Sequence, residues 1–419
     1  PYTMFGNLLP FLMLGILLAA ILSKPLERLR WISVPVALVI LGFLASEIWV
    51  GLGHDTGLRW EVLRDLVFYL LLPILIFEAA INIDTRMLRR ESVLIGALSV
   101  PLLLAAAGIA AVIILALMGE SLGNSWALAL LAGTMICATD PAMISGILGG
   151  NDSFRRVHHI LEGESLFNDA TTITLFVMIS GLIAMPAAEV NPYIALGRFL
   201  LNLLGGAAIG LTLGWLFDWI IAPANDKVLS TSATLVLAFT SFWVGEHLLG
   251  LSGVVATLAA GLTVAWRQRT HRSEEDIAFA LDAWQIMGFC ANAMLFFAVG
   301  MSITVQMFQH HWPAMLIGIL AALVSRAAIV FLGVGPVSRL PGVGALGLRE
   351  QNLVVWGGIR GAVAIALALS LSVDIPHWYT IQSTVYGVAL FSLVVQTPLL
   401  PLLARKPADP SAGANTGNG

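Results

Sequence analysis

The sequence predicts an all-α integral membrane protein with about 13 transmembrane helices. Of its 419 residues, 58% are hydrophobic and 11% are charged, whereas a soluble domain carries about 25% charged residues. Apolar runs of roughly 20 residues, long enough to cross a hydrocarbon core of about 30 Å, recur from end to end. The two cysteines, Cys137 and Cys290, lie inside such runs, so neither a disulfide framework nor a metal-binding spacing competes with this interpretation.

The apolar runs define the expected helices in chain order. The expected spans cover residues 4–22, 32–50, 63–83, 93–118, 126–149, 159–184, 191–222, 228–247, 251–266, 278–303, 312–334, 350–373 and 381–402. The first run could be a signal peptide, but it has neither a basic start nor a small-residue cleavage site, so we interpret it as a span. Residues 1–403 therefore form one transmembrane domain. Residues 404–419 are rich in proline, glycine, alanine and asparagine, and we expect a short disordered tail.

Lysine and arginine are distributed unequally between the two sides of these spans. Sixteen of the 21 basic residues fall in the connections of one side, and two, Arg59 and Arg64, fall on the other side. Basic connections stay on the cytoplasmic side of a membrane. We therefore expect a multi-pass protein of the cell (inner) membrane with its N-terminus outside and its C-terminus in the cytoplasm.

An odd number of spans permits an inverted repeat. If spans 1–6 and 8–13 are two copies joined by span 7, the second copy starts from the opposite side, as in many secondary transporters. Interrupted helices should then occur in spans 5 and 12. Span 5 contains Asp140 followed by Pro141, and proline disfavours helix for the preceding residue. Span 12 contains three glycines around Arg360. We predict two broken helices; ordinary kinks are the alternative, because proline and glycine are common in membrane helices.

Several ionisable residues lie at membrane depth. At about 1.5 Å per residue, Glu164 lies about 9 Å and Asp169 about 16 Å into span 6. Ser165 and Asp169 share one face of that helix, and Glu164 and Asn168 share the neighbouring face. Residues Glu78, Asp140, Arg326 and Arg360 lie midway along other spans. A charge at the centre of a membrane helix costs about 2.5–3.5 kcal/mol, so these side chains must face one another or a water-filled cavity.

The charges suggest separate roles for these residues. Arg326 keeps its proton, so it acts as a fixed countercharge, and Glu164 is its most economical partner. The remaining hard oxygen ligands are the carboxylates of Glu78, Asp140 and Asp169, the Ser165 hydroxyl and the carbonyls freed at Thr139. Such a set suits a hard cation and not a soft metal. A desolvated carboxylate in this place can hold a proton or a cation but never both, and this competition is the basis of an exchange mechanism.

Four stretches of the chain resemble the NhaP/NHE sodium/proton antiporters. They are Leu72–Ala80, Ala138–Pro141, Glu162–Ala170 and Trp356–Ala362, and they occur in the order of that family. The resemblance implies a monovalent cation:proton antiporter of the electroneutral branch, because Asn168-Asp169 stands where electrogenic relatives carry two aspartates. It also implies 1:1 exchange of Na⁺ or Li⁺ for H⁺ in pH homeostasis, with no cofactor and no nucleic-acid partner.

The resemblance further implies an architecture and a site. The fold would be NhaA-like, with two crossing broken helices, in a homodimer surrounded by membrane lipid. A dimerisation part would cover about 1–90 and 191–303, and a core part of about 91–186 and 312–403 would move like an elevator. The residues that bind the cation, Na⁺ as the metal, would be Asp169, Asp140, Ser165, Glu78 and Thr139. Asn168, Glu164, Arg326 and Arg360 would support the site, the last by steadying the crossed helices.

Other interpretations stay open at this point. A K⁺/H⁺ antiporter of the same fold would use the same kind of oxygen ligands. A cation channel would use rings of carbonyls or charges along an open pore, where an arginine–glutamate pair would be idle. An intramembrane aspartyl protease would also need two neighbouring aspartates, but neither buried arginine. Asp169 could cap a kink, Glu162 could be solvated, and the histidines, including His158 and His159, fall in or near expected loops and are interpreted as surface residues.

Overall fold

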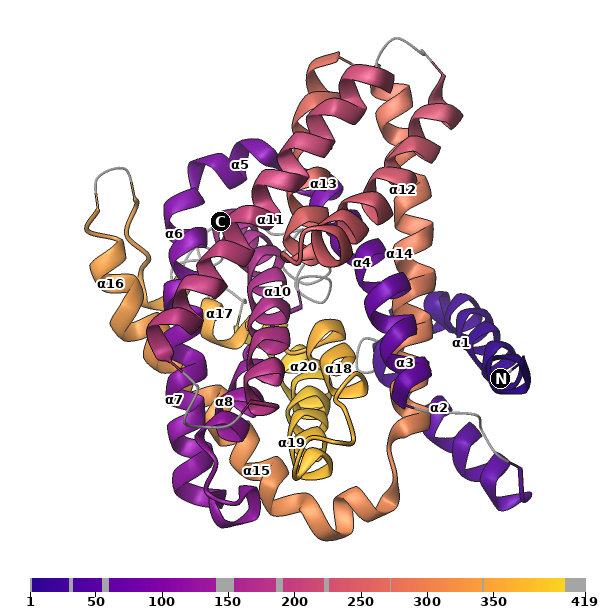
Figure 1. Cartoon of the computed structure of the whole chain (residues 1–419), viewed down its shortest axis with the longest axis vertical. Coiled ribbons are helices and arrows are strands. Elements are labelled where there is room, and N and C mark those ends of the chain that lie inside the picture. The colour runs from indigo at the N-terminus through magenta and orange to yellow at the C-terminus, as the bar shows by residue number, and fades with distance from the viewer. Residues whose placement is uncertain are drawn as a thin grey trace, which may run out of the picture.

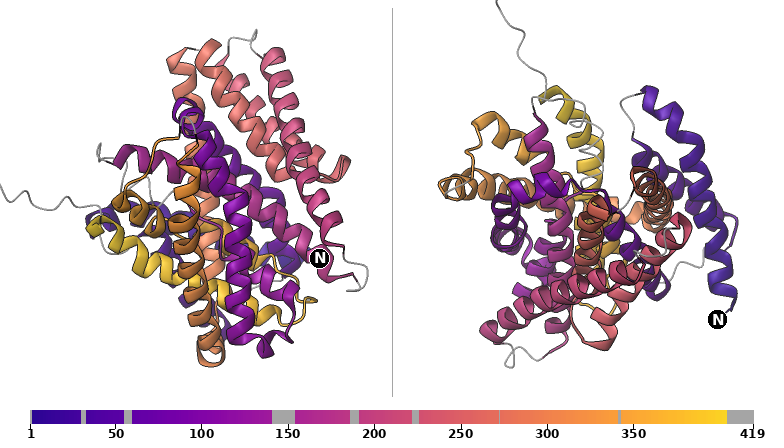
Figure 2. Two further views of the ribbon diagram at one scale, coloured as in Figure 1. Left: turned by 90° about the vertical axis from the view of Figure 1, so that its left-hand side faces the viewer. Right: turned by 90° about the horizontal axis from the view of Figure 1, so that it is seen from above.

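A computed structural model describes residues 2–29, 33–54, 60–140, 154–185, 191–221, 226–271, 273–340 and 343–403 of the chain. Over these ranges the secondary structure is helical, and the described residues contain no β-strand. The helices pack into one body in which α1 and α2 lie at one edge (Figures 1 and 2). The all-helical class predicted from the sequence is therefore confirmed.

The helices follow one another with short connections. In the first half of the chain they are α1 (Tyr2–Leu29), α2 (Val34–Gly51), α3 (Trp60–Leu66), the π-helical turn η1 (Val67–Leu71), α4 (Leu72–Asn82), α5 (Thr85–Arg90), α6 (Ser92–Ser99), α7 (Pro101–Met118), the 3₁₀ turn η2 (Glu120–Leu122), α8 (Trp126–Met135) and α10 (Arg155–Ile183). In the second half they are α11 (Pro192–Ile221), α12 (Lys227–Trp243), η6 (Val244–Leu248), α13 (Gly253–His271), α14 (Glu274–Ser302), α15 (Val305–Ala328), η7 (Ile329–Gly333), α16 (Val334–Val337), α17 (Leu348–Trp356), α18 (Ala362–Leu369), α19 (Trp378–Phe391), η8 (Ser392–Gln396) and α20 (Thr397–Leu403).

Short polar side chains start several of these helices. The Ser125 hydroxyl accepts a hydrogen bond from the Leu128 amide at the start of α8, at 3.4 Å. Asp226 accepts from the first turn of α12 at 2.8 and 2.9 Å, and Ser273 accepts from the first turn of α14 at 3.2 Å. Each cap satisfies an amide that has no partner inside its own helix. The apolar runs therefore begin where the sequence places serine or aspartate.

Each of the thirteen expected spans has a helical counterpart in the described part of the chain. Nine helical stretches there are at least 18 residues long and apolar enough to cross a membrane. The expected spans outside this set are the segment from α3 to α4, the short apolar helix α8, α13, and the pair α17 and α18. Helix α13 ends in basic residues, which lower its mean hydropathy. The spans that contain α8 and α17–α18 are interrupted, as the sequence predicted, so their helices are short.

Some helices extend beyond the expected boundaries. Helix α10 begins at Arg155, where we expected residue 159, and α15 begins at Val305, where we expected residue 312. The expected limits follow the apolar runs, whereas backbone hydrogen bonding continues through polar turns at a helix end. As a consequence, His158 and His159 lie near the start of a helix and not in a loop, and they are less exposed than expected. Both lie inside α10 and are half-buried.

Most helices pack in two groups. Helices α1, α2 and α4 pack with α11–α14, while α6–α8 and α10 pack with α15–α20. Helix α10 also contacts α11 and α13, so it lies between the groups, and α18 contacts α14 (Figure 1). The boundaries of these groups are close to those expected for the dimerisation and core parts. The functional division itself remains a proposal.

The two predicted interruptions meet inside the second group. After α8 the chain leaves the helix over Ile136–Asp140, and between α17 and α18 the helix is interrupted over Gly357–Gly361. The amide of Asp140 donates to the carbonyl of Ile359 at 2.7 Å, and the amide of Ala362 donates to Oδ2 of Asp140 at 2.9 Å. The broken segments are thus joined directly. Pro141 and the expected second half of span 5 lie outside the described residues.

Gly361 permits this close approach, because a Cβ atom at this position would overlap the Asp140 carboxylate. We therefore expect Gly361→Ala to destabilise the protein by about 1–3 kcal/mol, the usual effect of overpacking. The measurement is the thermal unfolding temperature of the purified protein in detergent. Gly108→Ala in α7 is the matched control, since a Cβ there meets no atom within 4 Å. Equal effects of the two substitutions would contradict the tight fit at Gly361.

Candidate functional site

Helix α10 binds the first break through two polar side chains. The Ser165 hydroxyl donates a hydrogen bond to the carbonyl of Thr139. The Asn168 amide donates to the carbonyl of Cys137 at 3.1 Å and to the Thr139 hydroxyl at 3.2 Å, while its oxygen accepts from Thr172 at 2.9 Å. Carbonyls at the end of α8 have no partner within their own helix. Here side chains of α10 satisfy the carbonyls of Cys137 and Thr139.

Buried charges lie at the two helix ends that face the breaks. The Asp140 carboxylate accepts from the first amide of α18, where the positive end of the helix dipole favours an anion. Arg360 points to the other break and donates a long hydrogen bond, 3.5 Å, to the carbonyl of Cys137 just after α8, where a cation is favoured. Asp140 is 6% exposed and Arg360 is 3% exposed. Each charge therefore matches the helix end that it faces.

Glu164 and Arg326 form a buried bidentate ion pair. Both guanidinium Nη atoms donate to the Glu164 carboxylate, with Nη2 at 2.8 Å from Oε2. Arg326 also donates from Nε and Nη2 to the carbonyl of Val354, at 3.3 and 3.0 Å. The two side chains are 1% and 4% exposed. This geometry joins α10, α15 and α17 and leaves neither charge without a partner.

Asp169 differs from the other acidic residues of the site. Its Oδ1 atom is buried and has no hydrogen-bond partner among the described residues. Asp140 lies close enough for its charge to act on both Asp169 and Glu78. Glu78 on α4 accepts a hydrogen bond from Asn82 at 2.9 Å. The Asp140 charge thus acts on carboxylates of two other segments, and Oδ1 of Asp169 has no hydrogen-bond partner in the described part of the chain.

Cavities lie on both sides of Asp169 along α10. One, of about 600 Å³, is lined by α5, α6, α13 and the Phe167 side chain. A second, of about 340 Å³, lies farther along α10 at Phe176 and Val177 and is lined also by Arg64 and Ser372. Phe167 precedes Asp169 and Phe176 follows it, so Asp169 lies between the two cavities along the axis of α10.

Hydrogen bonds at and beside the two breaks involve seven of the nine residues singled out from the sequence, while Asp169 follows Asn168 on α10 and Glu78 lies on α4. Ser165 and Asn168 contact the first break, Asp140 and Arg360 connect the two breaks, and the Glu164–Arg326 pair lies beside them. Sequence reasoning missed the backbone carbonyl of Val354, for which the sequence carries no signal, and it missed Asn82. The spacing of Asn82 four residues after Glu78 could have found it, since such residues share a helix face.

Comparisons with known proteins point to one family. The family model described as "Sodium/hydrogen exchanger, transmembrane" matches residues 13–406. The low-affinity Na(+)/H(+) antiporter NhaS1 of Synechocystis is 30% identical over 384 residues, which cover 90% of this chain and 70% of the relative. The Na(+)/H(+) antiporter ApNhaP of Aphanothece halophytica is 30% identical, with coverage of 90% and 70%. The fold resembles that of the sodium proton antiporter MjNhaP1 of Methanocaldococcus jannaschii, with a TM-score of 0.82, 20% identity, and coverage of 96% and 98%.

Removing one partner of the Glu164–Arg326 pair leaves an uncompensated buried charge. We expect Glu164→Ala and Arg326→Ala each to destabilise the protein by about 3–5 kcal/mol. The double variant should lose less than the sum of the two, because the second removal eliminates the stranded charge. The measurement is a double-mutant cycle on thermal stability in detergent.

The exposed pair between Lys227 and Glu275, 3.2 Å apart, is the matched control for this cycle. Its members are 43% and 82% exposed, and a surface pair contributes about 0–1 kcal/mol. Additive losses at Glu164 and Arg326 would show that the pair does not act as a unit.

Proposed function

The chain belongs to the sodium/hydrogen exchanger family, and from this premise we propose that it exchanges Na⁺ or Li⁺ for H⁺ by alternating access to one buried site. Membership of this family makes it a multi-pass membrane transporter and not an enzyme. The observation that carries the proposal is the buried Oδ1 atom of Asp169, which lacks a hydrogen-bond partner among the described residues. An unsatisfied carboxylate oxygen between two cavities can be satisfied by a proton or by a cation.

The proposed cation ligands are oxygen atoms around Asp169. Because the Ser165 hydroxyl donates its hydrogen to the carbonyl of Thr139, its lone pairs remain free to accept a cation. The Asp140 and Glu78 carboxylates are the further ligands of this proposal, and hard oxygen ligands of this kind suit Na⁺ and Li⁺. A proton on Asp169 removes the charge that attracts the cation, so the two substrates compete for one carboxylate.

The supporting residues have a separate role in this proposal. Arg326 is paired with Glu164 and Arg360 lies against the end of α8, so both arginines keep a constant charge while Asp169 changes its occupant. The group of α6–α8, α10 and α15–α20 would carry the site across the membrane like an elevator. The group of α1, α2, α4 and α11–α14 would hold two protomers together as a homodimer. The excess of basic residues on one side favours an outer N-terminus and a cytoplasmic C-terminus.

Asp169→Asn should abolish exchange while the protein stays folded. The amide keeps the shape of the side chain but can neither bind a proton nor supply a negative charge to a cation. The measurement is cation-driven proton flux in proteoliposomes, with Na⁺, Li⁺ and K⁺ tested in turn, beside thermal stability in detergent. Asp282→Asn on an exposed position of α14 is the matched control and should exchange at the wild-type rate. Wild-type flux in Asp169→Asn would remove this carboxylate from the mechanism.

Exchange should be electroneutral, one cation for one proton. If Asp169 alone alternates between the two while Asn168 cannot titrate and Arg326 keeps its charge, the moving group carries the same net charge in both directions. A net charge crossing the full potential would be worth about 2.3 kcal/mol per 100 mV. The measurement is sodium-driven proton flux under a potassium–valinomycin potential of either sign. Several-fold acceleration by one sign would mean that a second group, with Asp140 the first candidate, carries protons.

A further inference from the structure

We propose that His158, His159 and Glu162 form a binding site for a divalent transition-metal ion such as Zn²⁺, and that the bound ion inhibits exchange. The three side chains lie at the start of α10, outside the cation site described above. Metal binding follows from their own geometry. The inhibition rests on the proposed function, because it requires that α10 carries the exchanged ion.

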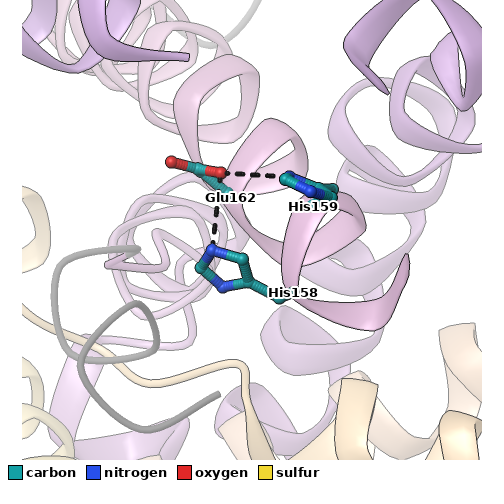
Figure 3. A group of neighbouring side chains, drawn as sticks. All are labelled: His158, His159 and Glu162. Carbon is teal, nitrogen blue, oxygen red and sulfur yellow. Dashed lines mark ion pairs between the residues drawn. The ribbon is translucent and has the colours of Figure 1, made fainter. Parts of the chain in front are cut away.

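The three ligand atoms converge (Figure 3). Nε2 of His158 lies 3.8 Å and Nδ1 of His159 lies 3.6 Å from the same oxygen, Oε2 of Glu162. All three atoms lie within 4.8 Å of one another. Positions four and three residues apart share a helix face, so regular α-helical geometry alone brings the imidazoles to either side of the carboxylate.

This ligand set matches the requirements of zinc. Zn²⁺ binds imidazole nitrogen and carboxylate oxygen at about 2.0–2.2 Å, which places two ligand atoms of a tetrahedral site about 3.4 Å apart. The two histidine–glutamate distances exceed this value by a few tenths of an ångström, a difference that small rotations of the side chains close. Three protein ligands leave the fourth position to water. Imidazole ligands favour zinc, nickel and copper, whereas Mg²⁺ and Ca²⁺ prefer oxygen alone.

The surroundings favour an ion that binds weakly and reversibly. The side chains of His158, His159 and Glu162 are 12%, 19% and 27% exposed, so an ion can enter but would lose part of its hydration. The neighbouring Arg156 does not neutralise Glu162, because its guanidinium is held by Glu91 at 2.9 and 3.1 Å. Nδ1 of His158 is buried with no hydrogen-bond partner among the described residues. Metal sites normally give this nitrogen a partner, and the loss of one lowers affinity about 10–100-fold.

The proposed metal site lies on the same face of α10 as the proposed cation ligands. Positions 158, 162, 165 and 169 are separated by four, three and four residues, so His158 and Glu162 share a face of α10 with Ser165 and Asp169. From Glu162 to Asp169 the helix rises about 10 Å. A dication held there would repel a monovalent cation that approaches Asp169 from the same end of the helix. All three ligands belong to one helix, so the ion would act through its charge and bulk and not by linking two moving parts.

Direct binding is tested first, because it needs no transport. Purified protein without a histidine tag is titrated with Co²⁺, whose visible absorption reports coordination by nitrogen and oxygen, and Zn²⁺ is then added to displace it. We expect a Co²⁺ signal that Zn²⁺ abolishes, and at least a tenfold loss of affinity in His158→Ala and in His159→Ala. His310→Ala is the matched control, since His310 and His311 form another adjacent pair, on α15. Unchanged Co²⁺ affinity in both α10 variants would overturn the site.

Inhibition is tested next in proteoliposomes, with each variant compared with its own rate in the absence of zinc. We expect Zn²⁺ to inhibit the wild type, Mg²⁺ at the same concentration to have no effect, and Glu162→Gln to raise the inhibitory zinc concentration at least tenfold. Co²⁺ binding without zinc inhibition would overturn the inhibitory role. A wild type that binds Co²⁺ but exchanges no cation even without zinc would contradict the proposed function and not the metal site.

Discussion

The junction of the two broken spans is the constraint on which the rest of the structure depends. A bilayer supplies no water to free amides and carbonyls, so an interrupted helix is tolerated where protein groups replace the missing bonds. Here Asp140 serves both breaks, since its amide donates to Ile359 and its carboxylate accepts from Ala362. Ser165 and Asn168 satisfy carbonyls of the first break from α10. The orientation of α10, and with it the position of Asp169, follows from these bonds.

The junction also determines how the charges divide. Arg360 and Asp140 lie at helix ends of the opposite polarity, and Glu164 and Arg326 neutralise each other. Glu164 and the two arginines are stabilised as ions, so their charge is part of the scaffold. Asp169 has an oxygen without such a partner in the described part of the chain. For this reason we propose Asp169 as the point where a proton and a cation compete.

The sequence by itself determined the class, the spans and the breaks. Spans are readable because a hydrocarbon core of about 30 Å demands long apolar runs. The breaks are readable because glycines around Arg360 and a proline after Asp140 oppose regular helix. The importance of Asp169 and Glu164 could be predicted because a charged side chain deep in a membrane span is too unfavourable to occur without a partner or a function. Helix ends are less readable, since α10 continues through polar residues to Arg155 and includes His158, which we had expected in a loop.

The sequence predicted the Glu164–Arg326 pair from charge, but tertiary structure alone decided the contacts around it. Glu164 and Arg326 are 162 positions apart, and the carbonyl of Val354 completes their contact through a backbone atom that no side-chain pattern reveals. That Oδ1 of Asp169 has no partner among the described residues likewise depends on what the other helices leave unfilled. Apolar length and helix-breaking residues act within one segment, so they can be read along the chain. Contacts with backbone atoms of another segment depend on how the helices pack, which a linear pattern does not encode.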